Sequence, residues 1–404
     1  MTHTVVDQTL LEHVRTVLAR QAVEPTPARV AAALRADGRL LGDAAVLQIA
    51  DALRREIAGT GPLEPLLAEP GVSDVLVHGP RQVWVDRGGG LEPASVSFDG
   101  DAAVRRLAQR LAMSAGRRLD DATPFVDARL GDGTRFHAVL APVSAGGTCI
   151  SLRVPRRRAF AIDELVSEGS VPVAGASLLR RMVAARLAFL VSGGTGVGKT
   201  TLLAALLSLA PVDERLVLVE DANELMPDHP HVVRLEARPP NVEGAGEITL
   251  RTLVRQALRM RPDRLVVGEV RGPEVVDLLA ALNTGHEGGC GTLHANSASE
   301  VPARVEALGV AAGLDRAAVH SQLAAAVDAV LHLVRGRDGR RRVAEICVFT
   351  RAPDGLVRAR TAVEFGAGGE VREGAGMPSL RALLGRHKSA DATVCAFDSC
   401  AGSR

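Results

Sequence analysis

A glycine-rich turn in the second half of the chain has the residue types and spacing of a phosphate-binding loop. The run Gly193-Gly194-Thr195-Gly196-Val197-Gly198-Lys199-Thr200 matches the pattern G-x-x-x-x-G-K-T. An apolar stretch with strand character precedes it, and an apolar stretch with helical character follows it, which is the context that the pattern requires. Successive N–H groups of residues 194–199 would surround a β-phosphate, and the helix start adds its positive dipole end.

The side chains at the end of this run would complete a nucleoside triphosphate site. Lys199 would reach the β- and γ-phosphate oxygens, and the hydroxyl of Thr200 would bind Mg²⁺, so the expected cofactors are ATP and Mg²⁺. The predicted nucleotide contacts are Gly193, Gly194, Thr195, Gly196, Val197, Gly198, Lys199, Thr200 and Thr201. The alternative is a glycine-rich turn without a ligand, and the Lys-Thr pair in register with strand and helix argues against it.

Two other apolar stretches end in carboxylate residues. A nucleotide site needs acidic residues at such positions. Residues 265–268 lead to Glu269, which would hold Mg²⁺ through a water molecule at the Walker B position. Glu220 and Asp221 end the other stretch, and Glu224 follows. Carboxylates at the C-terminal ends of parallel strands line the crevice where ligands bind. Glu220 and Asp221 could equally cap a following helix, so their role stays open at this point.

Histidine and cysteine spacings define no metal site. His286 and His294 flank a glycine-rich stretch eight residues apart, which does not by itself make a metal pair. The five cysteines include no C-x-x-C pair, and their odd number argues against a disulfide framework, so a reducing cytoplasm is the simplest location. We expect no signal peptide and no membrane span, because no run of about 18 uncharged apolar residues occurs, and any membrane association would be peripheral.

Hydrophobic periodicity predicts the elements that would position these side chains. From Ala176 onward, strand-like and helical stretches alternate, which predicts an α/β domain with a largely parallel sheet and helices on both faces. Short alternating runs and glycine turns predict a smaller α+β domain before it. The predicted divisions are a helical segment 1–60, an α+β domain 61–155, a linker 156–175, a P-loop domain 176–350 and a partly disordered tail 351–404.

The amino-acid composition argues against nucleic acid as a direct ligand of this chain. The chain has 404 residues, and 48 Lys and Arg against 47 Asp and Glu give a formal charge of +1, as in ordinary soluble globular chains. Tyrosine is absent and Trp84 is the single tryptophan, so a stacking platform for single strands would have little to be built from. We therefore expect no direct nucleic-acid binding.

Four motifs together resemble the secretion ATPases of type II and type IV secretion systems, and more narrowly the branch serving tight-adherence (Tad) pili and conjugal-transfer loci. They are the phosphate loop, VEDANEL (219–225), RPPNVEGAGEITLRTLVRQALRMRPDRLVVGEVRG (238–272) and LNTGHEGGCGTLHAN (282–296), in the order of that family. The likeness covers about residues 61–350. It implies a RecA-like ATPase domain in a homo-hexamer at the cytoplasmic face of the plasma membrane, working with inner-membrane platform proteins of a pilus or secretion system.

The resemblance also implies a role for each matching residue. Glu220, Asp221 and Glu224 become the acidic box of the family, with Glu224 as the base that orients water. Arginines of the first domain would reach the γ-phosphate when the domains close, and a surface salt bridge is the alternative for each. Arg129 is a third and weaker candidate for this role. The expected catalytic residues are Lys199, Glu224, Glu269 as the Walker B acid, His294 of the histidine box, Arg135 and Arg153.

The predicted function is an ATPase motor for pilus assembly or protein secretion, with the linker as hinge. A conjugal DNA-transfer motor and a nucleotide-dependent scaffold without turnover are the alternatives. A small-molecule kinase would share the phosphate loop but would not explain the VEDANEL and GHEGGCGTLH motifs. The spacing of the two histidines argues against a retraction motor, and the missing tetracysteine module argues against the type II assembly branch. The sequence does not identify the cargo.

Overall fold

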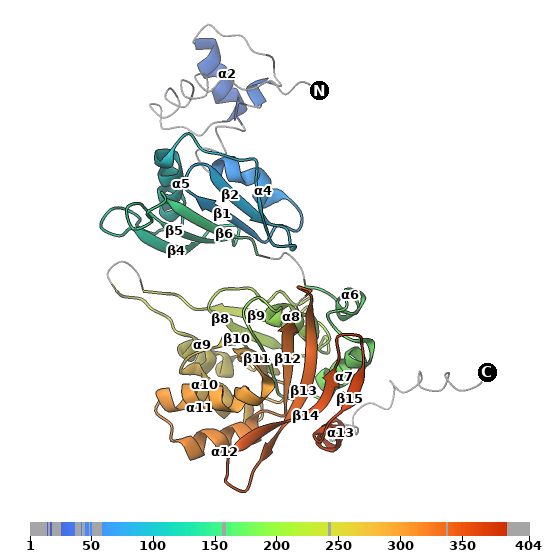
Figure 1. Cartoon of the computed structure of the whole chain (residues 1–404). Coiled ribbons are helices and arrows are strands. Elements are labelled where there is room, and N and C mark those ends of the chain that lie inside the picture. Colours follow the sequence, from blue (N-terminus) through green and yellow to red (C-terminus); the bar gives the residue numbers. More distant parts are fainter. Residues whose placement is uncertain are drawn as a thin grey trace, which may run out of the picture. The chain divides into compact units, whose positions relative to one another are not determined.

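The chain divides into two compact units, Met1–Pro155 and Arg156–Arg404 (Figure 1). The computed structural model describes residues 59–155, 159–240, 244–336 and 338–385, and before them Val14, Val17, 26–36, Gly42, 45–47 and 49–50. In this N-terminal part, helix α2 (Pro27–Ala36) contributes Val30 and Leu34 to a small buried cluster with Ile49. Most of the predicted helical segment 1–60 lies outside the described residues.

The first unit is built on a six-stranded antiparallel sheet in the order β3-β2-β1-β6-β5-β4. Alternate residues such as Val75, Phe136 and Leu152 are buried with the apolar side of α5, so this face of the sheet forms the core. The elements are η1 (Gly61–Leu63), α4 (Glu64–Ala68), β1 (Asp74–His78), β2 (Gln82–Asp86), β3 (Leu91–Pro93), α5 (Asp101–Ser114), β4 (Phe125–Arg129), β5 (Arg135–Val139) and β6 (Cys149–Arg153).

The second unit has a nine-stranded sheet in the order β15-β14-β13-β12-β7-β11-β10-β8-β9. The strands from β12 to β9 pair in parallel, whereas β13, β14 and β15 are joined as antiparallel hairpins. The strands are β7 (Phe189–Gly193), β8 (Leu216–Glu220), β9 (Val232–Glu236), β10 (Arg264–Val270), β11 (Cys290–His294), β12 (Ala329–Arg335), β13 (Arg341–Arg351), β14 (Val357–Phe365) and β15 (Val371–Glu373).

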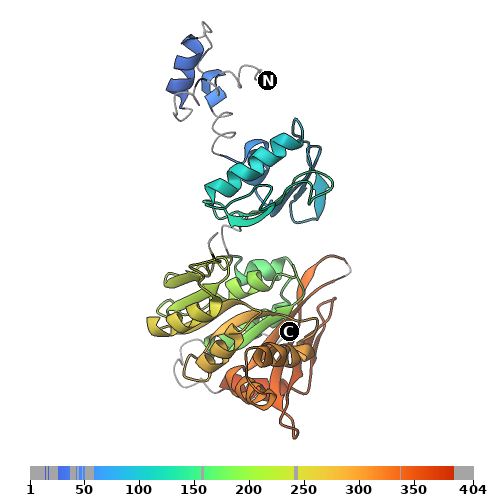
Figure 2. The same cartoon turned by 90° about the vertical axis from the view of Figure 1, so that its left-hand side faces the viewer.

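Helices cover both faces of this sheet, as Figures 1 and 2 show. Val191 of β7 faces one core with α6, α7, α8 and α13, whereas Leu190 faces the other core with α9, α10, α11 and α12. The helices are α6 (Ile162–Ser167), α7 (Val173–Ala184), α8 (Lys199–Leu207), α9 (Leu250–Ala257), η2 (Leu258–Met260), α10 (Glu274–Leu282), η3 (Ala298–Glu300), α11 (Val301–Ala311), α12 (Arg316–Ala326) and α13 (Met377–Gly385). No helix within the described ranges has the length and apolarity needed to span a bilayer.

Two predicted divisions are wrong in part. Residues 156–175 were expected to be a linker, yet Ile162 and Leu165 of α6 are buried in the core beside α8. Residues 351–404 were expected to be a tail, yet β14, β15 and α13 follow, and Phe365 and Leu380 are buried. The helices α6 and α13 have only six and nine residues, too few for a clear periodic pattern, and their burial depends on the sheet beneath them. Residues 386–404 lie outside the described part.

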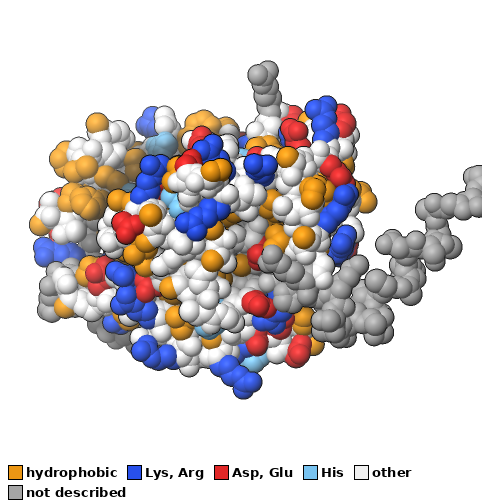
Figure 3. Space-filling model, turned by 90° about the horizontal axis from the view of Figure 1, so that it is seen from below, with side chains coloured by type: hydrophobic (Ala, Val, Ile, Leu, Met, Phe, Trp, Pro, Cys, Tyr) orange, Lys and Arg blue, Asp and Glu red, His pale blue; other side chains and the backbone are white. Residues whose placement is uncertain are grey.

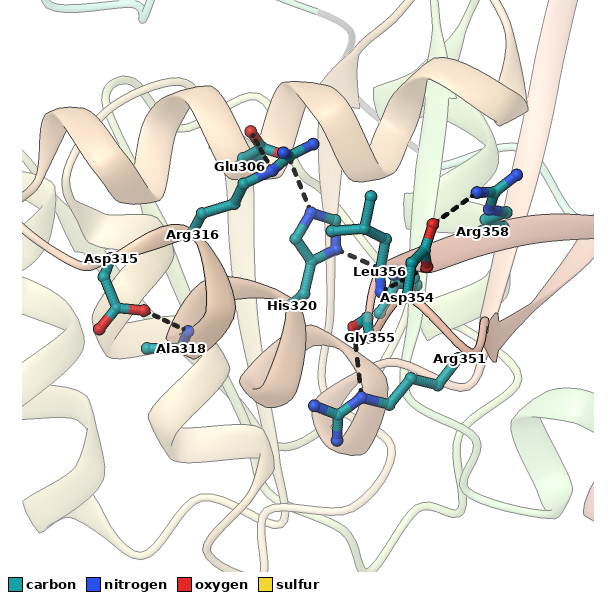
Figure 4. Close-up of polar contacts among 11 residues, drawn as sticks. Glu306, Asp315, Arg316, Ala318, His320, Arg351, Asp354, Gly355, Leu356 and Arg358 are labelled. Carbon is teal, nitrogen blue, oxygen red and sulfur yellow. Dashed lines mark hydrogen bonds and ion pairs between the residues drawn. The ribbon is translucent and has the colours of Figure 1, made fainter.

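A buried histidine ties α11, α12 and the start of β14 together (Figure 4). His320 of α12 is 3% exposed, and its Nε2 lies 2.8 Å from a carboxylate oxygen of Glu306 on α11. Its Nδ1 accepts a hydrogen bond of 3.0 Å from the N–H of Val357. Arg316 also pairs with Glu306, at 3.0 Å, but its side chain is mostly exposed. The ring therefore satisfies one buried backbone donor and links three elements through a single side chain.

We predict that His320→Ala lowers the free energy of unfolding by about 1–3 kcal/mol, because it leaves the buried N–H of Val357 without an acceptor. Arg316→Ala is the matched control, since it removes an exposed partner of the same carboxylate and should cost about 0–1 kcal/mol. Urea unfolding of the full chain measures both. Equal losses in the two variants would contradict a structural role specific to the ring.

Candidate functional site

The turn between β7 and α8 has the backbone shape that its glycines predict. All five residues of β7 are buried, and the strand ends at Gly193, where φ is 149°. A Cβ at this position would lie 2.6 Å from the carbonyl oxygen of Leu333 on the neighbouring strand, so only glycine fits. Gly198, with φ of 94°, then starts α8 at Lys199. The N-cap residue Gly198 makes no side-chain hydrogen bond to the start of α8, and a helix start of this kind suits an anion.

Lys199 lies inside this turn. Its Nζ donates hydrogen bonds to the carbonyl oxygens of Gly193, at 3.0 Å, and Gly194, at 2.8 Å. Burial lowers the pKa of Lys199, and the nearby carboxylate of Glu269 opposes that shift. The ammonium group is therefore held at the position where the turn and the helix start would receive phosphate oxygens.

The residues at this turn fit ATP with Mg²⁺. Thr200 lies in the first turn of α8, one residue after the lysine, where its hydroxyl could bind the ion. No group of three or more His, Cys, Asp or Glu in the described part of the chain could hold a metal. Mg²⁺ commonly takes one or two protein ligands and completes its shell with phosphate oxygens and water, so a dedicated cage is not needed.

A β-bulge re-aims Glu269 at the end of β10. The pairing of β10 with β11 shifts between Val267 and Val270, and Gly268 and Glu269 occupy the irregular position. The buried hydroxyl of Thr292 donates a hydrogen bond of 2.7 Å to the carbonyl oxygen of Gly268 and so replaces a lost ladder bond. Glu269 remains partly exposed at this edge, and its charge acts on Lys199.

Glu220 supports the turn that carries Glu224. Glu220 is 3% exposed, and its Oε1 accepts hydrogen bonds from the N–H groups of Glu224, at 3.0 Å, and Leu225, at 2.9 Å. Burial raises its pKa to about 7, and Oε2 is buried without a hydrogen bond. Gly268 makes room for it, since a Cβ there would lie 2.7 Å from the Cγ of Glu220. No helix follows β8 in the described residues before β9, so the helix-cap interpretation of Glu220 is wrong.

Arg271 links the two acidic motifs. It forms an ion pair with Asp221, and its other nitrogen lies 3.7 Å from Oε2 of Glu269. Asp221 therefore pairs with an arginine instead of capping a helix. Glu224 is exposed, on the turn that Glu220 holds. Sequence analysis did not single out Arg271, although it follows the Walker B acid by only two residues.

The two histidines of the glycine-rich motif lie in different settings. His294 is the exposed last residue of β11 and is in register with Gly193 of β7, so it stands beside the start of the phosphate loop. The ring of His286 lies 3.1 Å from the carbonyl oxygen of Ala281, near the end of α10.

A third histidine, which sequence analysis missed, lies beneath the loop. Nδ1 of His332 on β12 is 2.9 Å from the hydroxyl of Ser192, the residue before Gly193, and both side chains are buried. Burial lowers the pKa of His332, which favours the neutral ring. The pair attaches the end of β7 to β12. The sequence signal was a single polar residue in an otherwise apolar strand, VLHLV.

The three arginines singled out in the first unit occupy one row of its sheet. Arg129 pairs in register with Arg135, Arg135 with Arg153, and Arg153 with Asp74, across β4, β5, β6 and β1. Paired residues point to the same side, and the adjacent position Leu152 faces the core, so the row lies on the face away from α5. Nε of Arg153 donates a hydrogen bond of 3.0 Å to Asp74, yet most of its side chain stays exposed.

Comparison with known proteins gives a consistent family assignment. The model of the family described as type II/IV secretion system protein matches residues 56–345. A Mycobacterium tuberculosis protein whose name assigns it provisionally to conjugal transfer is 60% identical over 328 residues, which is 80% of this chain and 93% of that protein. The type IV secretion system protein PtlH of Bordetella pertussis is 33% identical over 314 residues, covering 70% of this chain and 92% of PtlH.

Solved structures share the fold. The pilus retraction motor PilT with bound ADP gives a TM-score of 0.52 at 20% identity, covering 72% of this chain and 83% of that chain. The ATPase DotB of Legionella pneumophila gives a TM-score of 0.50 at 19% identity, covering 73% of this chain and 80% of that chain. The likeness concerns the fold alone, and it confirms the predicted α/β P-loop NTPase class.

We predict that the buried Glu220 makes stability depend on pH. Its pKa rises from 4.5 to about 7 on folding, so the unfolded chain loses this proton first as the pH rises. The free energy of unfolding should therefore fall by about 2–3 kcal/mol between about pH 5 and about pH 8. Glu220→Gln cannot ionise and should lack this part of the fall. Urea unfolding of both proteins at the two pH values tests it, and parallel pH profiles would contradict the assignment.

Proposed function

This chain belongs to the type II/IV secretion system protein family, and from that premise we propose that it hydrolyses ATP as a hexameric motor for pilus assembly or protein secretion. The family match confirms the broader resemblance that the four motifs indicated, the one to type II and type IV secretion proteins. The observation that carries the enzymatic part is the meeting of three features at one edge of the sheet. These are the phosphate loop with Lys199, the acid Glu269 turned outward by a bulge, and the turn that presents Glu224.

The proposed chemistry assigns each side chain one task. The backbone of residues 193–201 and the start of α8 would bind the phosphates, and Lys199 would neutralise charge between the β- and γ-phosphates. Bound Mg²⁺, held by Thr200 and through water by Glu269, would supply further charge neutralisation. Glu224 would accept a hydrogen bond from the attacking water and align it with the γ-phosphorus, while Glu220 and Arg271 keep the two acidic motifs in place. His294 would contact the phosphate end from β11.

The proposal includes the arginine row of the first unit. We assign Arg135 and Arg153 to the γ-phosphate, where they would neutralise charge that develops during transfer, with Arg129 as a third candidate. Their common row on the exposed face supports a joint role, since one movement of the sheet would carry all three. The proposed source of force is rotation between the two units, which divide between Pro155 and Arg156.

The proposed setting is the cytoplasm, at the inner face of the plasma membrane. The homo-hexamer would use a head-to-tail interface that closes into a ring, and its partners would be inner-membrane platform proteins of a Tad-like or type IV system. The names of the relatives, which refer to conjugal transfer and to type IV secretion, support a place in such machinery.

A conjugal DNA-transfer motor is the second candidate, because the relative that is 60% identical carries a provisional conjugal-transfer name. DNA need not touch such a motor directly. On the face of the molecule seen in Figure 3, basic and acidic side chains are interspersed, whereas a direct DNA contact requires a continuous basic surface. Stimulation of ATP turnover by DNA would favour this candidate over protein export.

We predict that the assembled protein, with its mass checked by light scattering in a non-hydrolysable ATP analogue, releases phosphate from ATP. Lys199→Ala should abolish turnover, since it removes the charge that contacts the β- and γ-phosphates. Glu224→Gln should bind ATP normally and lower kcat by roughly 10²–10⁴. Turnover that survives Lys199→Ala would contradict the site, and normal binding without any wild-type turnover would favour the scaffold.

We predict that Arg135→Ala and Arg153→Ala each lower kcat by about 10²-fold or more and leave ADP affinity unchanged, because their proposed target is the γ-phosphate. Arg87→Ala is the control. It removes an arginine of the same unit that forms ion pairs with Glu69 and Glu92 instead of joining the row. Steady-state kinetics and ADP titration measure the effects. Loss of ADP affinity in the row variants, or equal loss of kcat in the control, would refute the assignment.

A further inference from the structure

The hairpin that joins β12 to β13 borders the phosphate loop and carries an excess of positive charge. Leu333 of β12 is in register with Gly193, so the end of β12 runs beside the start of the loop. The connecting sequence RGRDGRRR (335–342) has five arginines and one acid, Asp338. One oxygen of that acid accepts the N–H of Arg340, so its carboxylate serves the turn itself.

Arg341, at the start of β13, faces the loop. Val343, two residues further along β13, is buried in the core that contains α8, so the strand alternation directs Arg341 to the α8 side of the sheet. Its Cδ lies 3.8 Å from the position that a Cβ on Gly198 would occupy. The side chain therefore lies against the last loop residue before Lys199.

The guanidinium of Arg341 has no hydrogen-bond or ion-pair partner in the part of the chain that the structure describes, although its neighbours do. Arg335 donates to the carbonyl oxygen of Gly339, at 3.1 Å, and Arg342 donates to that of Phe365, at 2.6 Å. Arg341 is half-buried, and its side chain lies against Gly198 at the start of α8. A partly desolvated guanidinium at the positive end of a helix is unfavourable unless an anion binds there.

The strand order indicates which part of a nucleotide Arg341 would meet. Glu269 lies near the end of β10 and Glu224 follows β8, and both strands lie beyond β11 on one side of β7. The γ-phosphate must lie on that side, because the proposed water-orienting and metal-holding groups are there. Arg341 follows β12 on the opposite side of β7. A triphosphate that crosses the loop would thus present its α-phosphate end to Arg341.

We propose that Arg341 binds the α-phosphate of the nucleotide and so contributes to affinity for ADP and ATP alike, without acting on the transferred group. The inference rests on the proposed function, because it assumes that a nucleotide occupies the loop. Arg341 would be a binding residue supplied by the same unit as the loop. It differs in this from Arg135 and Arg153, which are assigned to the opposite end of the triphosphate.

The test is calorimetric titration of the full chain with ADP, alongside kcat and KM for ATP. Arg341→Ala should weaken ADP binding by roughly tenfold to a hundredfold, as expected for a charge-assisted hydrogen bond, and raise the KM for ATP in parallel with little change in kcat. Arg341→Lys keeps the charge and should lose less. Arg340→Ala is the matched control, because it removes the same charge one residue away, and should leave ADP binding unchanged.

The outcomes separate this inference from the function on which it rests. Unchanged ADP affinity in Arg341→Ala, while the wild type binds and hydrolyses ATP, would overturn the inference and leave the ATPase intact. A fall in kcat with normal ADP affinity would also overturn it, because it would put the side chain at the γ-phosphate. A loss as large in Arg340→Ala would show a general charge effect and overturn the specific contact. A wild type that binds no nucleotide would remove the proposed function itself.

Discussion

Parallel pairing around β7 is the constraint on which the candidate site depends. The C-terminal ends of parallel strands meet at one edge of a sheet, so Gly193, Glu220 and His294 come to the same edge from distant parts of the sequence. In a sheet with regular strand pairing throughout, the strands would continue past these residues, or some of the side chains would point into one of the two cores. Each departure from regularity is accordingly held by a buried polar side chain: Thr292 at the bulge, Glu220 at the acidic turn and His332 at the end of β7.

This arrangement gives the edge an electrical polarity. Acids gather beyond β11, where Glu269 and Asp221 share Arg271, and cations stand at the loop and beside β12. A nucleotide with Mg²⁺ would also have two electrically different ends. The metal would neutralise charge at the β- and γ-phosphates, at the end that meets the acids. The α-phosphate would keep uncompensated negative charge, at the end that meets the cations. The edge would thus fix the direction in which a triphosphate lies before any closing movement occurs. Binding and transfer would then depend on different side chains.

Sequence reasoning succeeded where a signal is local and failed where it depends on packing. The run 193–200 and the apolar strands before Glu220 and Glu269 are local patterns, and they predicted the fold class and the strand ends correctly. The helices α6 and α13 were missed because short segments carry little periodicity. Arg341 and His332 could not be found, because an arginine in a turn and a histidine in a strand acquire meaning only once the order of strands is known.

The row of Arg129, Arg135 and Arg153 has a consequence for how the first unit can change in length. Side chains alternate between the two faces of a strand, so inserting or deleting one residue within β5 would carry an arginine from the open face into the apolar interior. Changes in turns away from the row, as in Gly88-Gly89-Gly90 between β2 and β3, can be absorbed without disturbing it. We therefore expect natural size variation in this unit to be confined to loops away from the row, and comparing loop lengths among relatives would reveal that limit.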